Sequence, residues 1–145
     1  MTNLSDITVE EFTSLAPISI EKKADMDQAL ELMQENKIRH LPVIENQKVV
    51  GIISERDVLT HIGKDWGKML TVEDVMNTSL LSVYANDNLG EVAYQLSAQK
   101  KGSAIVLDTE GNLYGIFTTT DALNALVEIL YPMAYGQSDL NHTIL

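Results

Sequence analysis

Apolar and polar residues alternate along the chain with two different periods, one typical of helices and one typical of strands. In residues 26–33 the apolar side chains fall at positions i, i+3, i+4 and i+7, which places them on one face of a helix. Two short runs rich in aliphatic residues follow at 41–44 and 49–53, separated by the polar segment 45–48. The pattern therefore predicts a helix over about residues 25–36 and a β-hairpin after it.

The same succession of patterns returns 63 residues further along the chain. Residues 8–12 (TVEEF) match 71–75 (TVEDV), and residues 18–20 (ISI) match 81–83 (LSV). The apolar helical stripe returns at positions 89, 92, 93 and 96. After one extra residue in the second hairpin turn, residues 51–57 (GIISERD) match 115–121 (GIFTTTD). Agreement of this extent identifies an internal repeat.

Each copy predicts the order β-α-β-β-α, preceded by a short helix. The short helix opens at Thr8 or Thr71, where a carboxylate three residues later completes the pattern of a capping box. A short strand is expected near residues 18–20, and the closing helix of each copy begins near Glu55 or Thr119.

The two copies define the expected domain organisation. The first spans residues 7–62 and the second 70–131, with a linker at 63–69 and a C-terminal tail at 132–145. A unit of about 60 residues buries only a modest fraction of its surface, so we expect the pair to fold together. The predicted fold class is α+β (α/β), with two β-α-β-β-α repeats packed sheet to sheet about a pseudo-two-fold axis.

The charge balance is strongly acidic, because 21 Asp and Glu residues against 10 Lys and Arg residues give a net charge of −11. Such a surface repels phosphates, so neither nucleic acid nor an anionic membrane is expected as a partner. No segment approaches the roughly 20 apolar residues of a spanning helix, and the N-terminus lacks the features of a signal peptide. We therefore expect a cytoplasmic protein. The absence of cysteine excludes disulfides, thiolate metal sites and a cysteine nucleophile.

The residue patterns of common enzymes are missing. The three histidines, His40, His61 and His142, show no metal-ligand spacing. The sequence has no Gly-x-Ser-x-Gly elbow, no phosphate-binding P-loop and no dinucleotide-binding Gly-x-Gly-x-x-Gly. We expect no catalysis, no metal and no catalytic cofactor, and a small nucleotide hydrolase is the least favoured alternative.

Two motifs occupy corresponding places in the two copies. The first copy carries 36–44 (NKIRHLPVI) and 51–59 (GIISERDVL), and the second carries the looser 102–107 (GSAIVL), which lacks the proline, and 115–121 (GIFTTTD). In register within a repeat, these motifs resemble the CBS domain, named after cystathionine beta-synthase and found in pairs in many regulatory proteins. The resemblance covers residues 7–126. It implies ligand clefts between the repeats that hold AMP, ADP or ATP, with NAD and S-adenosylmethionine also open.

The hydroxyl and carboxyl residues of these motifs suit a nucleotide. Ser54 and Thr118 stand at the start of a helix, where free backbone N–H groups and the helix dipole favour anions. Asp57 and Asp121 can accept two hydrogen bonds from a ribose diol. The same residue types at the same spacing also form a helix capping box, which needs no ligand. The two interpretations are compatible, and the sequence leaves both open.

The resemblance adds residues around these four. Arg56 lies between Ser54 and Asp57 and could clamp a phosphate, and the resemblance places Arg39 and His40 beside the same group. Four further positions match those that flank the adenine in such modules: Ile18, Ile38, Leu81 and Lys101. The complete set of candidate nucleotide-binding residues is Ile18, Ile38, Arg39, His40, Ser54, Arg56, Asp57, Leu81, Lys101, Ser103, Thr118, Thr120 and Asp121.

The first copy predicts the stronger site for a phosphate. Much of the positive charge of the chain falls beside the predicted clefts, which suits a small anion, although strand-edge charges also discourage sheet pairing. These residues are Lys37, Arg39, His40, Arg56, Lys100 and Lys101. In the second copy Ser103 stands in the place of His40, and Thr120 in the place of Arg56. The cleft at Asp121 is therefore expected to hold a less charged adenosine compound, or nothing.

Residues 122–131 are apolar on more than one face, which is typical of a helix that is deeply buried or shared with a partner. Because CBS pairs resemble each other in forming homodimers through such helices, we expect a homodimer. Trp66 and Met69 either join that interface or pack locally. The regulated target is expected to be a separate, unidentified protein. The alternative function is a ligand-free module for protein interaction or dimerisation.

Overall fold

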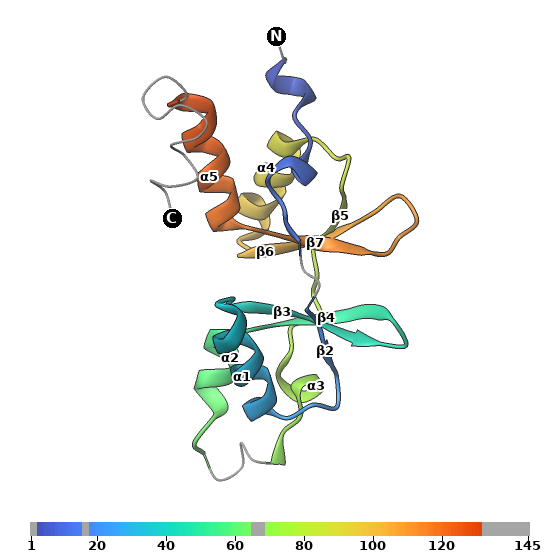
Figure 1. Ribbon diagram of the computed structural model, residues 1–145, viewed down its shortest axis with the longest axis vertical. Coiled ribbons are helices and arrows are strands. Elements are labelled where there is room, and N and C mark those ends of the chain that lie inside the picture. The colour runs from blue at the N-terminus through green and yellow to red at the C-terminus, as the bar shows by residue number, and fades with distance from the viewer. Residues whose placement is uncertain (1–2, 16–17, 65–68, 132–145) are drawn as a thin grey trace. The chain divides into compact units, whose positions relative to one another are not determined.

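The computed structural model describes residues 3–15, 18–64 and 69–131. It divides into two compact units, each built around one β-sheet (Figure 1). One unit consists of Ala16–Leu80, and we call it the Asp57 unit. The other combines Met1–Leu15 with Leu81–Leu145, and we call it the Asp121 unit. Each name refers to the candidate aspartate that the unit carries.

The sheet of the Asp57 unit has the strand order β2-β3-β4. β2 (Ile20–Glu21) runs parallel to β3 (His40–Glu45), and β4 (Lys48–Ser54) forms an antiparallel hairpin with β3. The helix α1 (Met26–Asn36) connects β2 to β3, and α2 (Glu55–His61) follows β4 directly. Apolar side chains from these elements and from the segment after residue 70 form one core: Ile20, Met26, Ala29, Met33, Leu41, Val43, Ile53, Val58 and Val72.

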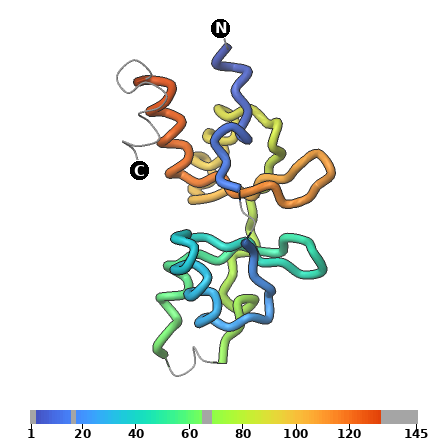
Figure 2. Tube along the Cα trace, viewed as in Figure 1, coloured from blue at the N-terminus to red at the C-terminus, as the bar shows by residue number. Residues whose placement is uncertain are grey.

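The Asp121 unit repeats this arrangement (Figure 2). β5 (Ser82–Tyr84) runs parallel to β6 (Ser103–Leu107), and β7 (Leu113–Thr118) pairs antiparallel with β6. The helices α4 (Leu89–Gln99) and α5 (Thr119–Leu130) correspond to α1 and α2. Its buried core consists of Val9, Leu81, Val83, Ala85, Leu89, Val92, Leu96, Ala104, Val106, Phe117 and Ala125.

The start of the chain completes the sheet of the Asp121 unit. Two short 3-10 helices, η1 (Leu4–Asp6) and η2 (Val9–Phe12), lead into the strand β1 (Ser14–Leu15). β1 pairs antiparallel with β7, with Ser14 opposite Ile116, so the strand order is β1-β7-β6-β5.

The opening helix of each sequence copy packs in the unit that the other copy mainly builds. Val9 of η2 is fully buried in the Asp121 unit, where its N–H donates to the carbonyl of Asp87 at 2.8 Å. Val72 of α3 (Val72–Val75) is fully buried in the Asp57 unit, where its N–H donates to the carbonyl of Ala24 at 2.8 Å. Each core therefore needs a residue from both copies, which agrees with the expectation that the pair folds together.

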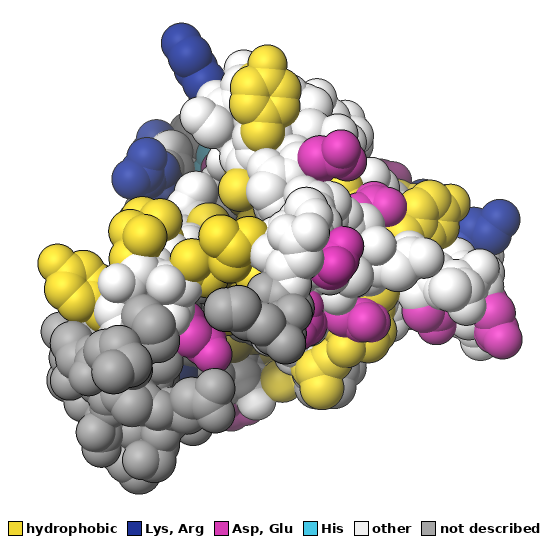
Figure 3. Space-filling view, turned by 90° about the horizontal axis from the view of Figure 1, so that it is seen from above, with side chains coloured by type: hydrophobic (Ala, Val, Ile, Leu, Met, Phe, Trp, Pro, Cys, Tyr) yellow, Lys and Arg dark blue, Asp and Glu magenta, His cyan; other side chains and the backbone are white. Residues whose placement is uncertain are grey.

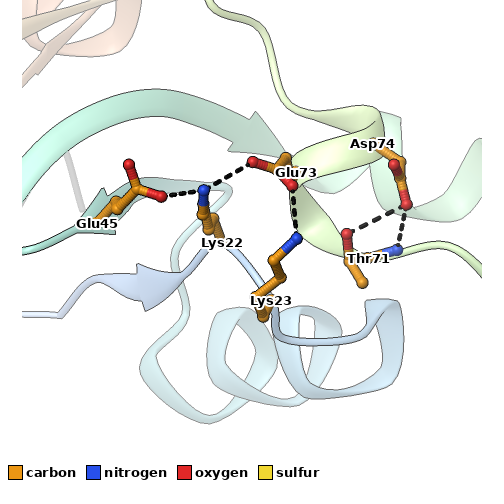
Figure 4. Close-up of polar contacts among 6 residues, drawn as sticks. All are labelled: Lys22, Lys23, Glu45, Thr71, Glu73 and Asp74. Carbon is orange, nitrogen blue, oxygen red and sulfur yellow. Dashed lines mark hydrogen bonds and ion pairs between the residues drawn. The ribbon is translucent and has the colours of Figure 1, made fainter.

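A group of charged side chains attaches α3 to the Asp57 unit (Figure 4). Lys22 forms ion pairs with Glu45 and, at 3.1 Å, with Glu73, and Lys23 pairs with Glu73 at 2.9 Å. The hydrogen bond from Lys23 lowers the pKa of Glu73 below its ordinary value, and Glu73 raises that of Lys23 in return. Because the group lies at the surface, its contribution to stability is modest.

The helices and the hairpins expected from the sequence are confirmed. α1 begins after the N-cap Asp25, α2 and α5 begin at Glu55 and Thr119, and both Thr8 and Thr71 form capping boxes. The strand expected near residues 18–20 begins two residues later than expected, since the structure places β2 at Ile20–Glu21. The expected mixed α and β fold class is confirmed as well.

Candidate functional site

The candidate residues of the Asp57 unit gather where β3 begins and β4 ends. His40, the first residue of β3, lies opposite Ser54, the last residue of β4. The N–H of Glu55, which begins α2, donates to the carbonyl of Arg39 at 2.8 Å. The hairpin register and this bond bring Arg39 and His40 to the start of the helix that carries Arg56 and Asp57.

Ser54 and Asp57 form a reciprocal capping box. The N–H of Ser54 donates to Asp57 Oδ2 at 3.0 Å, and the N–H of Asp57 donates to Ser54 Oγ at 3.1 Å. The capping interpretation of this motif is thus confirmed. It leaves acceptor capacity, because among the described residues none donates a hydrogen bond to Oδ1 of Asp57. The carboxylate is half-buried and oriented by its cap, with one oxygen available.

The surroundings of His40 favour the neutral form of its imidazole. Burial lowers the pKa of its imidazole below the ordinary value; the carboxylate of Asp57 opposes this effect, and the guanidinium of Arg39 adds to it. A bound anion would act in the opposite direction and favour the imidazolium. Arg39 and Arg56 are both exposed, and neither guanidinium is paired with another of the described residues, so each can reach a ligand.

The Asp121 unit repeats the box with more contacts on the carboxylate. Ser103 lies opposite Thr118, and Oδ2 of Asp121 accepts from the N–H of Thr118 at 2.9 Å and from its hydroxyl at 3.0 Å. The N–H of Asp121 donates to Thr118 Oγ1 at 3.2 Å. The hydroxyl of Ser14, in β1, donates to Oδ1 of Asp121 at 3.1 Å. Asp121 is only 9% exposed, whereas Thr120 beside it is exposed.

The residues predicted to flank the adenine lie next to the two cores. Ile18 and Ile38 are half-buried against the core of the Asp57 unit. Leu81 belongs to the core of the Asp121 unit and accepts a hydrogen bond from Ile105, and Lys101 is half-buried after α4. The structure thus divides the candidate set into two groups, one in each unit, and the clefts between the repeats stay a prediction.

Two glycines, one inside β4 and one inside β7, meet other parts of the chain. A methyl group on Gly51 would stand 2.5 Å from the sulfur of Met76. A methyl group on Gly115 would collide with the carbonyl oxygen of Ser14. The sequence does not identify the segments that approach these glycines, nor Ser14 as a site residue. Ser14 is 107 positions from Asp121, and no local pattern marks such a contact.

The positive charge is divided unequally between the units. Residues 16–80 hold eight of the ten Lys and Arg residues, with eleven Asp and Glu residues. Residues 1–15 and 81–145 hold two lysines against ten Asp and Glu residues. An anionic ligand is therefore favoured in the Asp57 unit.

Metal-binding clusters and membrane-spanning helices are both absent from the described parts of the chain. No group of three or more His, Cys, Asp and Glu side chains there is arranged to hold a metal ion. None of the helices there combines the length and the hydropathy that crossing a bilayer requires. Trp66 lies outside the described residues, and Met69 is 84% exposed.

Comparison with known proteins identifies the family. The CBS domain model matches the chain twice, at residues 9–64 and 72–128. The chain belongs to the CBS domain family. The two matches confirm the tandem pair, and the same pairing occurs in solved relatives.

A CBS domain-containing protein of Dictyostelium discoideum is 27% identical over 139 residues, which cover 88% of this chain and 96% of that protein. The crystal structure of CBSX2 in complex with AMP has a TM-score of 0.71 and 31% identity, covering 84% of this chain and 97% of that one. CBSX2 is a protein of Arabidopsis thaliana. The CBS domain of a bacterial CNNM/CorC family Mg²⁺ transporter, solved with ATP, has a TM-score of 0.77 at 24% identity over 86% of this chain and 89% of that one.

Other relatives are longer than this chain. The chain spans 39% of the length of an uncharacterized protein of Methanocaldococcus jannaschii, to which it is 23% identical over 85% of its own length. It spans 22% of the L-aspartate semialdehyde sulfurtransferase of the same organism, at 25% identity over 78% of its own length. In these proteins the CBS pair accompanies other segments.

Proposed function

We propose that this CBS pair is a non-catalytic regulatory module that binds an adenosine nucleotide, with its main site at Asp57. The observation that carries the proposal is Oδ1 of Asp57, to which no described residue donates a hydrogen bond, and which is oriented by the capping box and placed next to His40 and Arg56. The box fixes the carboxylate before a ligand arrives, so little ordering is required on binding.

The ribose is the group that Asp57 would recognise. A carboxylate has about four acceptor sites, and the cap uses one of those of Asp57. The 2′- and 3′-hydroxyl groups of a ribose can both donate to such a carboxylate. The half-buried Ile18 and Ile38 of the same unit would provide apolar contacts for the adenine.

The phosphate is the group that the cations would recognise. Arg39 and Arg56 are exposed guanidiniums, whose planar donors suit a phosphate. The pKa of His40 is lowered by burial in the free protein, and a bound phosphate would raise it. The concentration of Lys and Arg in residues 16–80, which hold eight of the ten in the chain, supports the same assignment.

The ligands of solved relatives support the adenosine part of the proposal. CBSX2 was solved with AMP, the CBS pair of protein MJ0100 with 5′-methylthioadenosine and S-adenosylmethionine, and the CNNM/CorC domain with ATP. An adenosine moiety is common to all of them, whereas the charge of the rest differs. AMP, ADP and ATP are therefore the first compounds to test, followed by NAD and S-adenosylmethionine.

Ligand binding would change the state of a homodimer. We propose that the protein is a cytoplasmic homodimer in which α5 contributes to the interface, and that it regulates a separate protein. The leucines Leu123, Leu126 and Leu130 are 62%, 51% and 63% exposed along this helix, and apolar side chains gather on the face seen in Figure 3. A nucleotide changes such a system only if it binds two states of the dimer with different affinity.

A second candidate function is a ligand-free interaction module. One observation favours it: both candidate aspartates already act as helix caps, a role that needs no ligand. Under this alternative the capping boxes serve stability alone, and the exposed leucines of α5 carry the function.

Thermal unfolding with a panel of adenosine compounds tests the proposal. A ligand at about 100 times its dissociation constant adds about 2.7 kcal/mol to the free energy of unfolding, which is a clear rise in Tm. The rise should occur with at least one nucleotide and disappear in Asp57→Ala. Asp74→Ala is the matched control, because Asp74 completes the capping box of Thr71 in the same unit with a 2.8 Å bond.

Three results would be distinguishable. A rise in Tm kept by Asp74→Ala and lost by Asp57→Ala supports the nucleotide sensor. No rise with any compound supports the ligand-free module. Turnover of ATP that persists in Asp57→Ala after repeated purification would instead indicate an enzyme.

A further inference from the structure

Ser14 and Asp121 are joined by a hydrogen bond that links the start of the chain to the second candidate aspartate. The hydroxyl of Ser14 donates to Oδ1 of Asp121 at 3.1 Å, across 107 residues of sequence. Asp121 is 9% exposed whereas Ser14 is exposed, so the bond is partly buried, and its charged acceptor makes it stronger than a bond between neutral groups.

The hydrogen bonds of Asp121 leave little room for a ribose. Oδ2 already accepts from the N–H and the hydroxyl of Thr118, at 2.9 and 3.0 Å, and Oδ1 accepts from Ser14. Three of about four acceptor sites are therefore in use. A ribose diol needs two acceptor sites on the carboxylate. It can bind to this carboxylate with both hydroxyl groups only after one existing bond is given up.

Ser14 is the partner that a ribose could replace. The two bonds from Thr118 belong to the helix cap, and their loss would disturb the start of α5. The Ser14 bond belongs to β1, a strand of two residues at the edge of the sheet. It is thus the least costly of the three hydrogen bonds to release.

The Asp57 unit has no such contact among its described residues. Asn77 occupies the place of Ser14, where its backbone pairs with Ile52, and its side-chain oxygen accepts from the N–H of Ser79. The contact to Oδ1 that distinguishes the two aspartates therefore comes from one residue of the opening segment, Ser14.

We propose that Ser14 gates ribose binding at Asp121: an adenosine compound binds there by displacing the Ser14 hydroxyl, which loosens the attachment of β1. Occupancy of this site is thereby transmitted to the opening segment of the chain. The inference rests on the proposed function, because it takes Asp121 as a second ribose acceptor.

Calorimetric titration with adenosine tests the gate in the Asp57→Ala background, where the Asp121 site is measured alone. Adding Ser14→Ala should tighten adenosine binding about tenfold, because the ligand no longer competes with an internal bond to a charged group. Ser14→Thr keeps the hydroxyl and should bind as the background does. Ser82→Ala, an exposed serine of β5 in the same unit, is the matched control and should change nothing.

Equal or weaker binding in the Ser14→Ala variant would overturn the inference, since a purely structural serine predicts that result. The absence of adenosine binding in both Asp57→Ala and Asp57→Ala/Ser14→Ala would also overturn it. That result would leave the proposed function at Asp57 intact, because AMP binding to the protein with Asp57 present tests that function. If Ser14→Ala does not fold, Ser14→Cys replaces it. A thiol is a weaker donor, so an intermediate gain in affinity is expected.

Discussion

The sulfur of Met76 lies against the backbone of Gly51, where a methyl group in place of the glycine hydrogen would stand only 2.5 Å from it. In the Asp121 unit, the carbonyl oxygen of Ser14 lies against Gly115 in the corresponding way. Each glycine admits the opening segment of the other sequence copy. The two close contacts are three residues before Ser54 and Thr118, so they fix the ends of the strands that carry the candidate sites.

The two glycines should differ in their tolerance of a side chain. Gly115→Ala is expected to lower the free energy of unfolding by about 2–3 kcal/mol, because backbone of β1 must move away. Gly51→Ala should cost about 1 kcal/mol, since the nearest atoms belong to the flexible side chain of Met76. Denaturant unfolding measures both values.

Gly102→Ala is the control for this pair, because no atom lies within 4 Å of the added methyl group. Its effect should stay within about 0.5 kcal/mol. Equal losses for Gly51→Ala and Gly115→Ala, or no loss for either, would contradict the exchange of opening segments.

The turn between β3 and β4 stores removable strain. Asn46 and Gln47 have φ values of 50° and 67°, the left-handed conformation at both positions of a type I′ turn. Gln47→Gly should raise the free energy of unfolding by about 0.5–1 kcal/mol, because glycine adopts this conformation without a steric penalty. The same substitution in a helix, Gln95→Gly in α4, should lower it by about 1 kcal/mol. A loss at position 47 would contradict the turn geometry.

The sequence predicts the units of structure better than the contacts between distant segments. The apolar stripes predict α1 and α4, and the threonine–carboxylate spacing predicts the caps, because both signals are local. The strand β1 is missed, because its two residues show no period and their partners lie in β7. The exchange of Val9 and Val72 is missed for the same reason, since a repeat in sequence does not say which copy an element packs against.

In the candidate site, too, the local motifs are predictable from the sequence and the contacts between distant segments are not. Ser54 and Asp57 are predictable, because the cap and the ribose-binding interpretation use one short motif. The hydrogen bond from Ser14 to Asp121 is not, and it makes the second site differ from the first in a way that the substitutions at Ser103 and Thr120 do not reveal.

His40 should make stability depend on pH. Its pKa is lowered in the folded state, mainly by burial, from a value of about 6.5 in the unfolded chain. Well above that pH, His40 is neutral in both the folded and the unfolded protein, so it does not make the free energy of unfolding depend on pH. As the pH falls through about 6.5 the unfolded chain takes up a proton that the folded protein resists, so the free energy of unfolding decreases. His40→Gln should lose less stability than the wild type between pH 7 and pH 5.

The nucleotide should reverse this effect. A phosphate beside His40 raises the pKa of the imidazole, so AMP binding takes up a proton and tightens as the pH falls from 8 to 6. The gain in AMP affinity over this pH range should be larger for the wild type than for His40→Gln. The phosphate of AMP titrates in the same way with both proteins, so the difference between them reports on His40. Identical pH profiles for the two proteins, measured by calorimetry, would place the phosphate away from His40.

The apolar face of α5 predicts self-association. Leu126→Glu should raise the dissociation constant of the homodimer at least tenfold, because a carboxylate cannot be buried there unpaired. Sedimentation equilibrium at micromolar concentration measures it. Tyr84→Glu, an exposed residue of β5 rather than of α5, is the control and should leave the dimer intact. A wild-type monomer, or a Leu126→Glu dimer of unchanged affinity, would contradict the assignment.

The most direct test of nucleotide binding at Asp57 is an AMP titration followed by amide NMR of the wild-type protein. AMP should cause saturable changes in the chemical shifts of the N–H groups of His40, Ser54, Arg56 and Asp57. These changes should be lost in Asp57→Ala and kept in Asp74→Ala. Shifts that avoid these four residues, or no shifts at millimolar AMP, would contradict the account.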